Sequence, residues 1–196
     1  MNGKITTLDL CYSAIFICLM AIGANVSVWF PFLAIPIGGV SVPLSLQTFF
    51  SILAGFLLGK RLGSLAMIGY IGLGIMGVPV FAQMQGGPFV LFSYTGGFLI
   101  SFIFVTYITG YLAEQFEEVT LNTGLMISLT GTLVNYLIGV SYMYLAMNTW
   151  LGLEVSYQGA WISMIPFILK DSALAFVATL VLVKVIRRIP ALARTI

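Results

Sequence analysis

Long runs of apolar residues with almost no charge dominate this chain and decide what it can fold into. Of its 196 residues, 60% are hydrophobic and only 7% are charged. A soluble domain carries about 25% charged residues, so eight basic and six acidic side chains cannot cover the surface of a soluble protein of this length. The sequence therefore predicts an all-α integral membrane protein and argues against a soluble enzyme.

An α-helical membrane span needs about 20 mostly apolar residues. We expect six spans in a single transmembrane domain, 1–196, at approximately 10–30, 42–58, 64–81, 90–113, 125–147 and 161–185. The segment 31–41 is rich in Pro and Gly but too apolar for an exposed loop, so we expect it to fold back against the protein at membrane depth. Gly55, Gly59 and Gly63 are interpreted as helix-packing positions and a turn.

The basic residues predict the orientation of these spans. Six spans place both termini on one side of the membrane, and Lys and Arg gather on the cytoplasmic side. No Lys or Arg falls in the three loops opposite the termini, which predicts cytoplasmic termini; the residues on the terminal side are Lys4, Lys60, Arg61, Lys184, Arg187, Arg188 and Arg194. A net charge of +2 without a basic cluster indicates no nucleic-acid partner.

Lys170 and Asp171 lie inside the predicted sixth span. An ionisable side chain costs several kcal/mol at membrane depth and marks a functional site by default. A structural ion pair, or a Lys170 side chain that reaches the interface, is the alternative interpretation. Adjacent helical residues point about 100° apart, so we expect Asp171 to face inward and Lys170 to reach round.

Neutral polar residues complete the candidate site. Small and polar residues share one face of the predicted fifth span because their spacing is three or four; they are Ser128, Gly131, Thr132, Asn135 and Gly139. Helix packing explains most of this stripe, but the Asn135 amide needs hydrogen-bond partners that a ligand could supply. The outer side also holds Gln47, Thr48, Gln85 and Tyr94 among aromatic residues, a composition that suits a small, mostly neutral organic ligand.

Several kinds of chemistry are not expected. The chain contains no His, which excludes imidazole metal sites and His-based acid–base catalysis. We expect no catalytic residue, no metal and no cofactor. Asn25–Val26–Ser27 matches a glycosylation sequon but lies inside the first span and is interpreted as inert.

One long segment carries a family resemblance. IPIGGVSVPLSLQTFFSILAGFLLGKRLGSLAMIGYIGLGIMGVPVFA, residues 35–82, resembles the hallmark stretch of the BioY family, the substrate-binding (S) components of energy-coupling-factor (ECF) biotin transporters of bacteria and archaea. Weaker matches follow in QGGPFVLFSYTGGF, 85–98, and PFILKDSALA, 166–175.

The resemblance implies the six-helix S-component fold in a prokaryotic plasma membrane, with an outward-facing pocket for biotin, the transported ligand. Loops between spans one and two and between spans three and four would cap this pocket. The partners would be a transmembrane coupling (T) subunit and two ATPase subunits, and Ala14, Cys18 and Ala21 of the first span are the candidate docking residues. Asp171 matches the family position that accepts hydrogen bonds from the ureido N–H groups of biotin.

Two departures concern the biotin carboxylate. Typical members carry Arg where this chain has Gln85 and Lys where it has Leu174. Lys170 is the cation that remains in the outer or membrane region, and our hypothesis is that it substitutes for both. The alternatives are an S component for a different small carboxylate vitamin or heterocycle, a purely structural membrane protein, and, remotely, an intramembrane enzyme, which the lack of paired acids and of Ser–His chemistry disfavours.

Overall fold

The computed structural model describes residues 6–37 and 40–188. Within this part of the chain, five helices are long and apolar enough to cross a membrane; they are α1 (Thr7–Trp29), α2 (Gln47–Ile75), α3 (Gly96–Ala113), α4 (Leu121–Thr149) and α5 (Tyr157–Arg188). Shorter elements join them: η1 (Pro31–Leu33), β1 (Ala34–Ile37), β2 (Val40–Pro43), η2 (Ala82–Met84) and η3 (Pro88–Phe92). Lys4 and Arg194, two of the basic residues used above, lie outside the described residues.

Helix α2 reverses direction at Gly59. The backbone there has φ 73° and ψ 173°, a conformation that is essentially restricted to glycine. Gln47 Nε2 donates to the Tyr70 hydroxyl at 2.9 Å, although 23 residues of straight helix would separate them by about 35 Å. The element therefore consists of two helical segments, 47–58 and 60–75, that lie side by side, and the predicted turn at Gly59 is confirmed.

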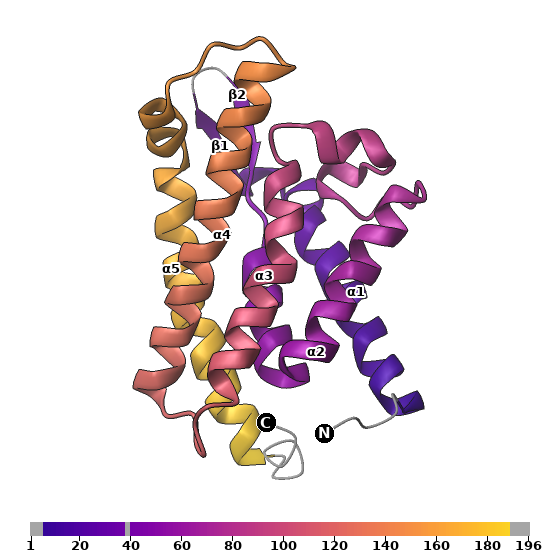
Figure 1. Ribbon diagram of the computed structural model, residues 1–196, viewed down its shortest axis with the longest axis vertical. Helices are drawn as coiled ribbons and strands as arrows, with labels where there is room; N and C mark the ends of the chain where they lie inside the picture. The colour runs from indigo at the N-terminus through magenta and orange to yellow at the C-terminus, as the bar shows by residue number, and fades with distance from the viewer. Residues whose placement is uncertain (1–5, 38–39, 189–196) are drawn as a thin grey trace.

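The two ends of the molecule differ in what they contain. Figure 1 shows the start of α1, the loop between α3 and α4 and the end of α5 at one end of the molecule. The β1–β2 hairpin, η2, η3 and the loop between α4 and α5 lie at the opposite end. The break at Gly59 lies beside the end of α3, because Lys60 Nζ is 2.6 Å from Glu114 Oε2 and the Lys60 N–H donates to Glu114 Oε1.

Helix α4 shows how the sequence pattern fits a membrane. Its small and polar stripe is buried, which confirms the predicted packing face. The opposite face exposes Met126, Leu129, Leu133 and Leu137. This is the reverse of a helix in a soluble protein, where apolar residues face the core, and polar groups of membrane helices face the bundle interior. The protein is a multi-pass membrane protein.

Three predicted boundaries were wrong. The second span does not begin at 42, because Val42 pairs with Ile35 in the antiparallel hairpin and the helix starts at Gln47. The described part of segment 31–41 consists of η1 and the two hairpin strands, and its depth in the membrane stays a prediction. The third span ends at Ile75 rather than 81, and the fourth begins at Gly96 rather than 90 because η3 precedes it. Phe81 and Val90 are apolar because they line a cavity, so hydropathy alone extended both spans.

Candidate ligand-binding cavity

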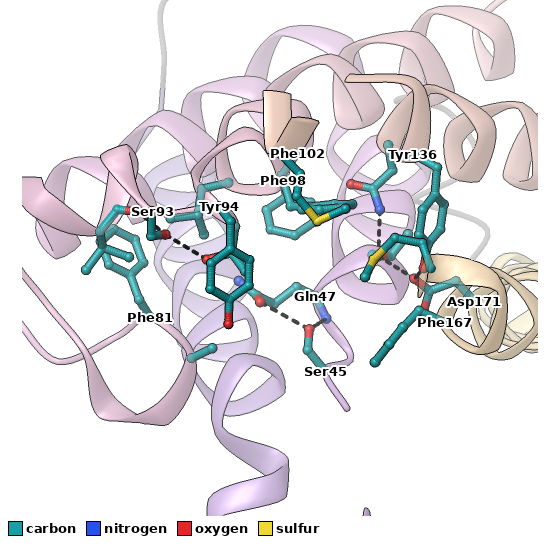
Figure 2. Close-up of a pocket in the computed structure, with 18 of the residues that line it drawn as sticks. Ser45, Gln47, Phe81, Ser93, Tyr94, Phe98, Phe102, Tyr136, Phe167 and Asp171 are labelled. Carbon is teal, nitrogen blue, oxygen red and sulfur yellow. Dashed lines mark hydrogen bonds between the residues drawn. The ribbon is translucent and has the colours of Figure 1, made fainter. Parts of the chain in front are cut away.

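A cavity of about 400 Å³ lies between the start of α2, the η2–η3 segment, α3, α4 and α5. Its size falls in the range of about 300–1,000 Å³ that small-molecule sites occupy. All seven side chains predicted to contact a ligand line this one cavity: Gln47, Thr48, Gln85, Tyr94, Asn135, Lys170 and Asp171. Figure 2 shows Asp171 and Tyr136 at one side of the cavity and Ser93 and Phe81 at the other.

Asp171 is the most constrained polar group in the cavity. It is 4% exposed, and its Oδ2 accepts hydrogen bonds from the Tyr136 hydroxyl at 2.7 Å and from Thr48 Oγ1 at 3.0 Å. Its Oδ1 is buried and, among the residues that the structure describes, receives no hydrogen bond. A buried acceptor without an aligned hydrogen bond is costly, so Oδ1 can accept one from a ligand N–H group beside its ion pair with Lys170.

Lys170 lies beside this carboxylate. Its Nζ is 2.7 Å from Asp171 Oδ1, an ion pair that is not aligned as a hydrogen bond. The same ammonium group donates to the backbone oxygen of Ser45. An ammonium has three donors, so Lys170 keeps donor capacity toward the cavity while it balances the charge of Asp171. The predicted inward Asp171 with Lys170 reaching round is the arrangement found.

Asn135 is linked to Asp171 through Thr48. Its Nδ2 donates to Thr48 Oγ1 at 3.2 Å, and its Oδ1 accepts from the Ser101 hydroxyl at 2.6 Å. Thr48 accepts this bond and donates its own proton to Asp171. The hydrogen bonds thus run in one direction, from Ser101 to Asn135 to Thr48 to Asp171, and Asp171 is the acceptor at the end.

The opposite side of the cavity has neutral polar groups and no charge among its described residues. Gln85 and Tyr94 are both exposed there, whereas Gln47 is buried and bonded to Tyr70. The wall between the two sides is apolar and aromatic; it includes Phe98, Leu99, Phe102, Met143, Met164 and Phe167. Such a cavity suits a ligand with a polar head, an apolar body and a second polar end.

Sequence reasoning missed Tyr136 and Ser101. Tyr136 is 4% exposed and packs edge-on against Phe98 with ring centroids 5.9 Å apart. It lies outside the small-residue stripe used for prediction, although a tyrosine hydroxyl in a membrane helix needs a partner and could have been found by that signal. Ser101 carries no such signal, because a serine in a membrane helix can bond its own backbone.

The three predicted docking residues lie along α1, away from the cavity lining. Ala14 and Cys18 are exposed and Ala21 is half-buried. The other face of α1 buries Phe16, Met20 and Ala24. Helix α1 therefore exposes Ala14 and Cys18 beside larger residues such as Ile15 and Ile22, and a docking partner for this face stays a prediction. No group of three or more metal-ligating side chains occurs among the described residues.

Comparisons with known proteins identify the family of this chain. The BioY family model matches residues 1–191. BioYB of Bacillus subtilis (strain 168) is 39% identical over 186 residues, which cover 95% of this chain and 91% of that protein. The biotin transporter BioY of Rhodobacter capsulatus is 34% identical over 153 residues, covering 76% and 80% of the two chains.

A solved structure has the same fold. The crystal structure of the S-component for biotin from an ECF-type ABC transporter matches with a TM-score of 0.79 at 22% identity and covers 95% of each chain. With the family model matched over nearly the whole length, the chain belongs to the BioY family.

Proposed function

We propose that this protein is the biotin-binding S component of an ATP-driven ECF-type vitamin uptake transporter, and not an enzyme. One observation carries the proposal: the buried Asp171 Oδ1 faces a cavity of about 400 Å³ and, among the described residues, is paired with the Lys170 ammonium but accepts no aligned hydrogen bond. The ureido ring of biotin offers N–H donors to this oxygen. Curated relatives named biotin transporter BioY support the choice of ligand.

Lys170 could bind either the ureido oxygen or the carboxylate of biotin. An extended ligand cannot bring both groups to Lys170. Its Nζ lies 2.7 Å from Asp171 Oδ1, so a ureido group on Asp171 would place the ureido oxygen within reach of Lys170. The carboxylate of biotin is separated from the ureido group by a bicyclic ring and a pentanoate chain, and in an extended ligand it would lie near Gln85 and Tyr94 instead. The role first expected, Lys170 on the carboxylate, requires the ligand to fold back or to bind in the opposite direction.

The break in α2 and the positions of the basic residues support a membrane arrangement. We propose six crossings, with segments 47–58 and 60–75 of α2 counted separately, cytoplasmic termini and a cavity that opens outward. Lys60 and Arg61 next to the break at Gly59 then lie on the cytoplasmic side of a prokaryotic plasma membrane. The chain has no nucleotide-binding motif, so the ATP-driven step belongs to a T subunit and two ATPase subunits, with Ala14, Cys18 and Ala21 on the docking face of α1.

The second candidate is an S component for a different small carboxylate vitamin or heterocycle. It is favoured by the absence of Arg and Lys at Gln85 and Leu174. Native mass spectrometry of protein purified without added ligand, followed by binding measurements with a panel of vitamins, separates the two candidates. We expect biotin in the spectrum and the tightest binding for biotin, whereas preference for another vitamin would contradict the biotin assignment.

A further inference from the structure

The segment 81–85 forms one wall of the cavity and has a strained backbone. Phe81, Ala82, Gln83 and Gln85 line the cavity. Two consecutive residues, Gln83 and Met84, have left-handed φ angles of 59° and 56°. Non-glycine residues in this conformation cost about 1–3 kcal/mol each and persist only where surrounding contacts hold them.

Helix α1 supplies the contact that holds the tip of this segment. The Met84 N–H donates to Asn25 Oδ1 at 2.7 Å, across 59 residues of sequence. Asn25 is 2% exposed, and its Nδ2 donates to the Ala21 carbonyl one turn earlier at 2.9 Å. Both polar atoms of the amide are therefore used, and Asn25 does not line the cavity itself.

Two hydrogen bonds from α2 flank the segment. Tyr70 donates to the Val80 carbonyl, and the Gly87 N–H donates to the Gly74 carbonyl. These two bonds fix the ends of the segment, whereas Asn25 binds the left-handed residue between them. The start of α2, which also lines the cavity through Gln47, is bonded to the same turn of α1. There the Leu46 N–H donates to the Gly23 carbonyl at 2.9 Å.

We propose that Asn25 is a positioning residue for the ligand cavity: its side-chain oxygen holds the 81–85 segment against α1 as a closed wall and thereby sets the rate at which the ligand leaves. Asn25, whose sequon was interpreted above as inert, then has a structural role. The effect on ligand release rests on the proposed function, but the anchoring of 81–85 does not.

Hydrogen–deuterium exchange with Asn25→Leu tests the anchoring in ligand-free protein. Leucine keeps the branching at Cγ, is somewhat larger and removes the acceptor, and one hydrogen bond contributes about 1 kcal/mol. We expect the Met84 amide to exchange about five- to tenfold faster. Exchange at 45–48 should stay unchanged, because its bond to the Gly23 carbonyl is made by backbone atoms.

Two matched variants separate anchoring from general damage to α1. Asn25→Asp keeps a side-chain oxygen for the Met84 N–H and should restore slow exchange. Ser13→Ala removes another side-chain bond to the preceding turn of α1, Ser13 Oγ to the Asp9 carbonyl, and should leave 81–85 as in the wild type. If Asn25→Leu does not fold, the wild-type protein still decides the question, because an unprotected Met84 amide would overturn the proposal.

Release of radiolabelled biotin from the same variants tests the consequence. We expect Asn25→Leu to release biotin about five- to tenfold faster, with Asn25→Asp and Ser13→Ala close to the wild type. Faster exchange at Met84 with unchanged release would overturn the role in ligand retention. Failure of the wild-type protein to bind biotin would instead reject the proposed function. The exchange measurement on ligand-free protein would still test the anchoring of 81–85 by Asn25.

Discussion

Asp171 receives hydrogen bonds on only one of its two oxygens, and this asymmetry defines what the cavity can bind. Tyr136 and Thr48 both donate to Oδ2, so the carboxylate is held in one orientation with Oδ1 toward the remaining space. Lys170 balances the charge without filling the acceptor site. A ligand that brings an N–H group completes this arrangement, and an anionic oxygen at the same point would be repelled.

Replacing Tyr136 by Phe should weaken biotin binding without removing the aromatic wall. Hydrogen bonds to charged groups contribute about 1.5–3 kcal/mol, and if about half of this reaches the ligand, the Kd rises roughly tenfold. Equilibrium binding to purified protein measures the change. Tyr144→Phe is the control, since Tyr144 lies two turns further along α4 and does not line the cavity. Equal Kd values for wild-type protein and Tyr136→Phe would show that Tyr136 does not position Asp171.

Biotin methyl ester distinguishes the two roles of Lys170. Because Lys170 Nζ lies beside Asp171, we expect Lys170→Met to weaken the binding of biotin and of its methyl ester by similar factors. Competition binding with both ligands provides the two factors. A loss confined to free biotin would mean that Lys170 pairs with the carboxylate and that the ligand lies the other way round.

The sequence predicted much of this site and missed its supporting groups for a physical reason. A charged pair or an amide in an apolar helix stands out because lipid offers it no partner, and Asp171, Lys170 and Asn135 were found this way. Ser101 and Asn25 have ordinary local explanations, and their roles arise from Asn135 and from Met84, which are 34 and 59 residues away in the chain. Only the folded arrangement brings those partners together.

Among the elements, α2 depends most on a single residue. Gly59 lies where the helix reverses, and Gly110 of α3 packs so closely that a Cβ on it would lie 2.3 Å from Lys60 N. Hydropathy predicted two spans here with a gap at 59–63, and the gap proved to be one residue wide. The last hairpin residues, 42–43, and part of η3, 90–92, were mistaken for parts of spans, because apolar residues outside the helices have the same composition as those that face lipid.

Gly59→Ala should destabilise the protein by about 1–3 kcal/mol, because alanine rarely adopts φ 73° with ψ 173°. Thermal unfolding in detergent measures the loss. Gly72→Ala is the matched control in the same element: a Cβ there has open space around it, and alanine favours a helix interior over glycine by about 1 kcal/mol. If the two variants unfold at the same temperature, the break at Gly59 does not need glycine.

For the whole molecule, the central expectation is that the cavity end faces outward. Glu154 lies in the loop between α4 and α5, at the end of the molecule that also holds the β1–β2 hairpin (Figure 1). Glu117 lies in the loop between α3 and α4, at the opposite end. With Cys11 and Cys18 replaced by Ala, a membrane-impermeant maleimide on intact cells should label Glu154→Cys and leave Glu117→Cys unlabelled until the cells are permeabilised. Labelling of Glu117→Cys alone would reverse the proposed orientation.

The most direct test of the account is the equilibrium binding of radiolabelled biotin to purified wild-type protein and to Asp171→Asn, measured side by side. Asp9→Asn serves as the control, because Asp9 caps the start of α1 through Thr6 and lies outside the cavity. We predict that Asp171→Asn raises the Kd roughly 100-fold, by about 2.8 kcal/mol, while Asp9→Asn binds as the wild type does. Equal affinity of Asp171→Asn and wild-type protein, or no binding by the wild type, would contradict the account.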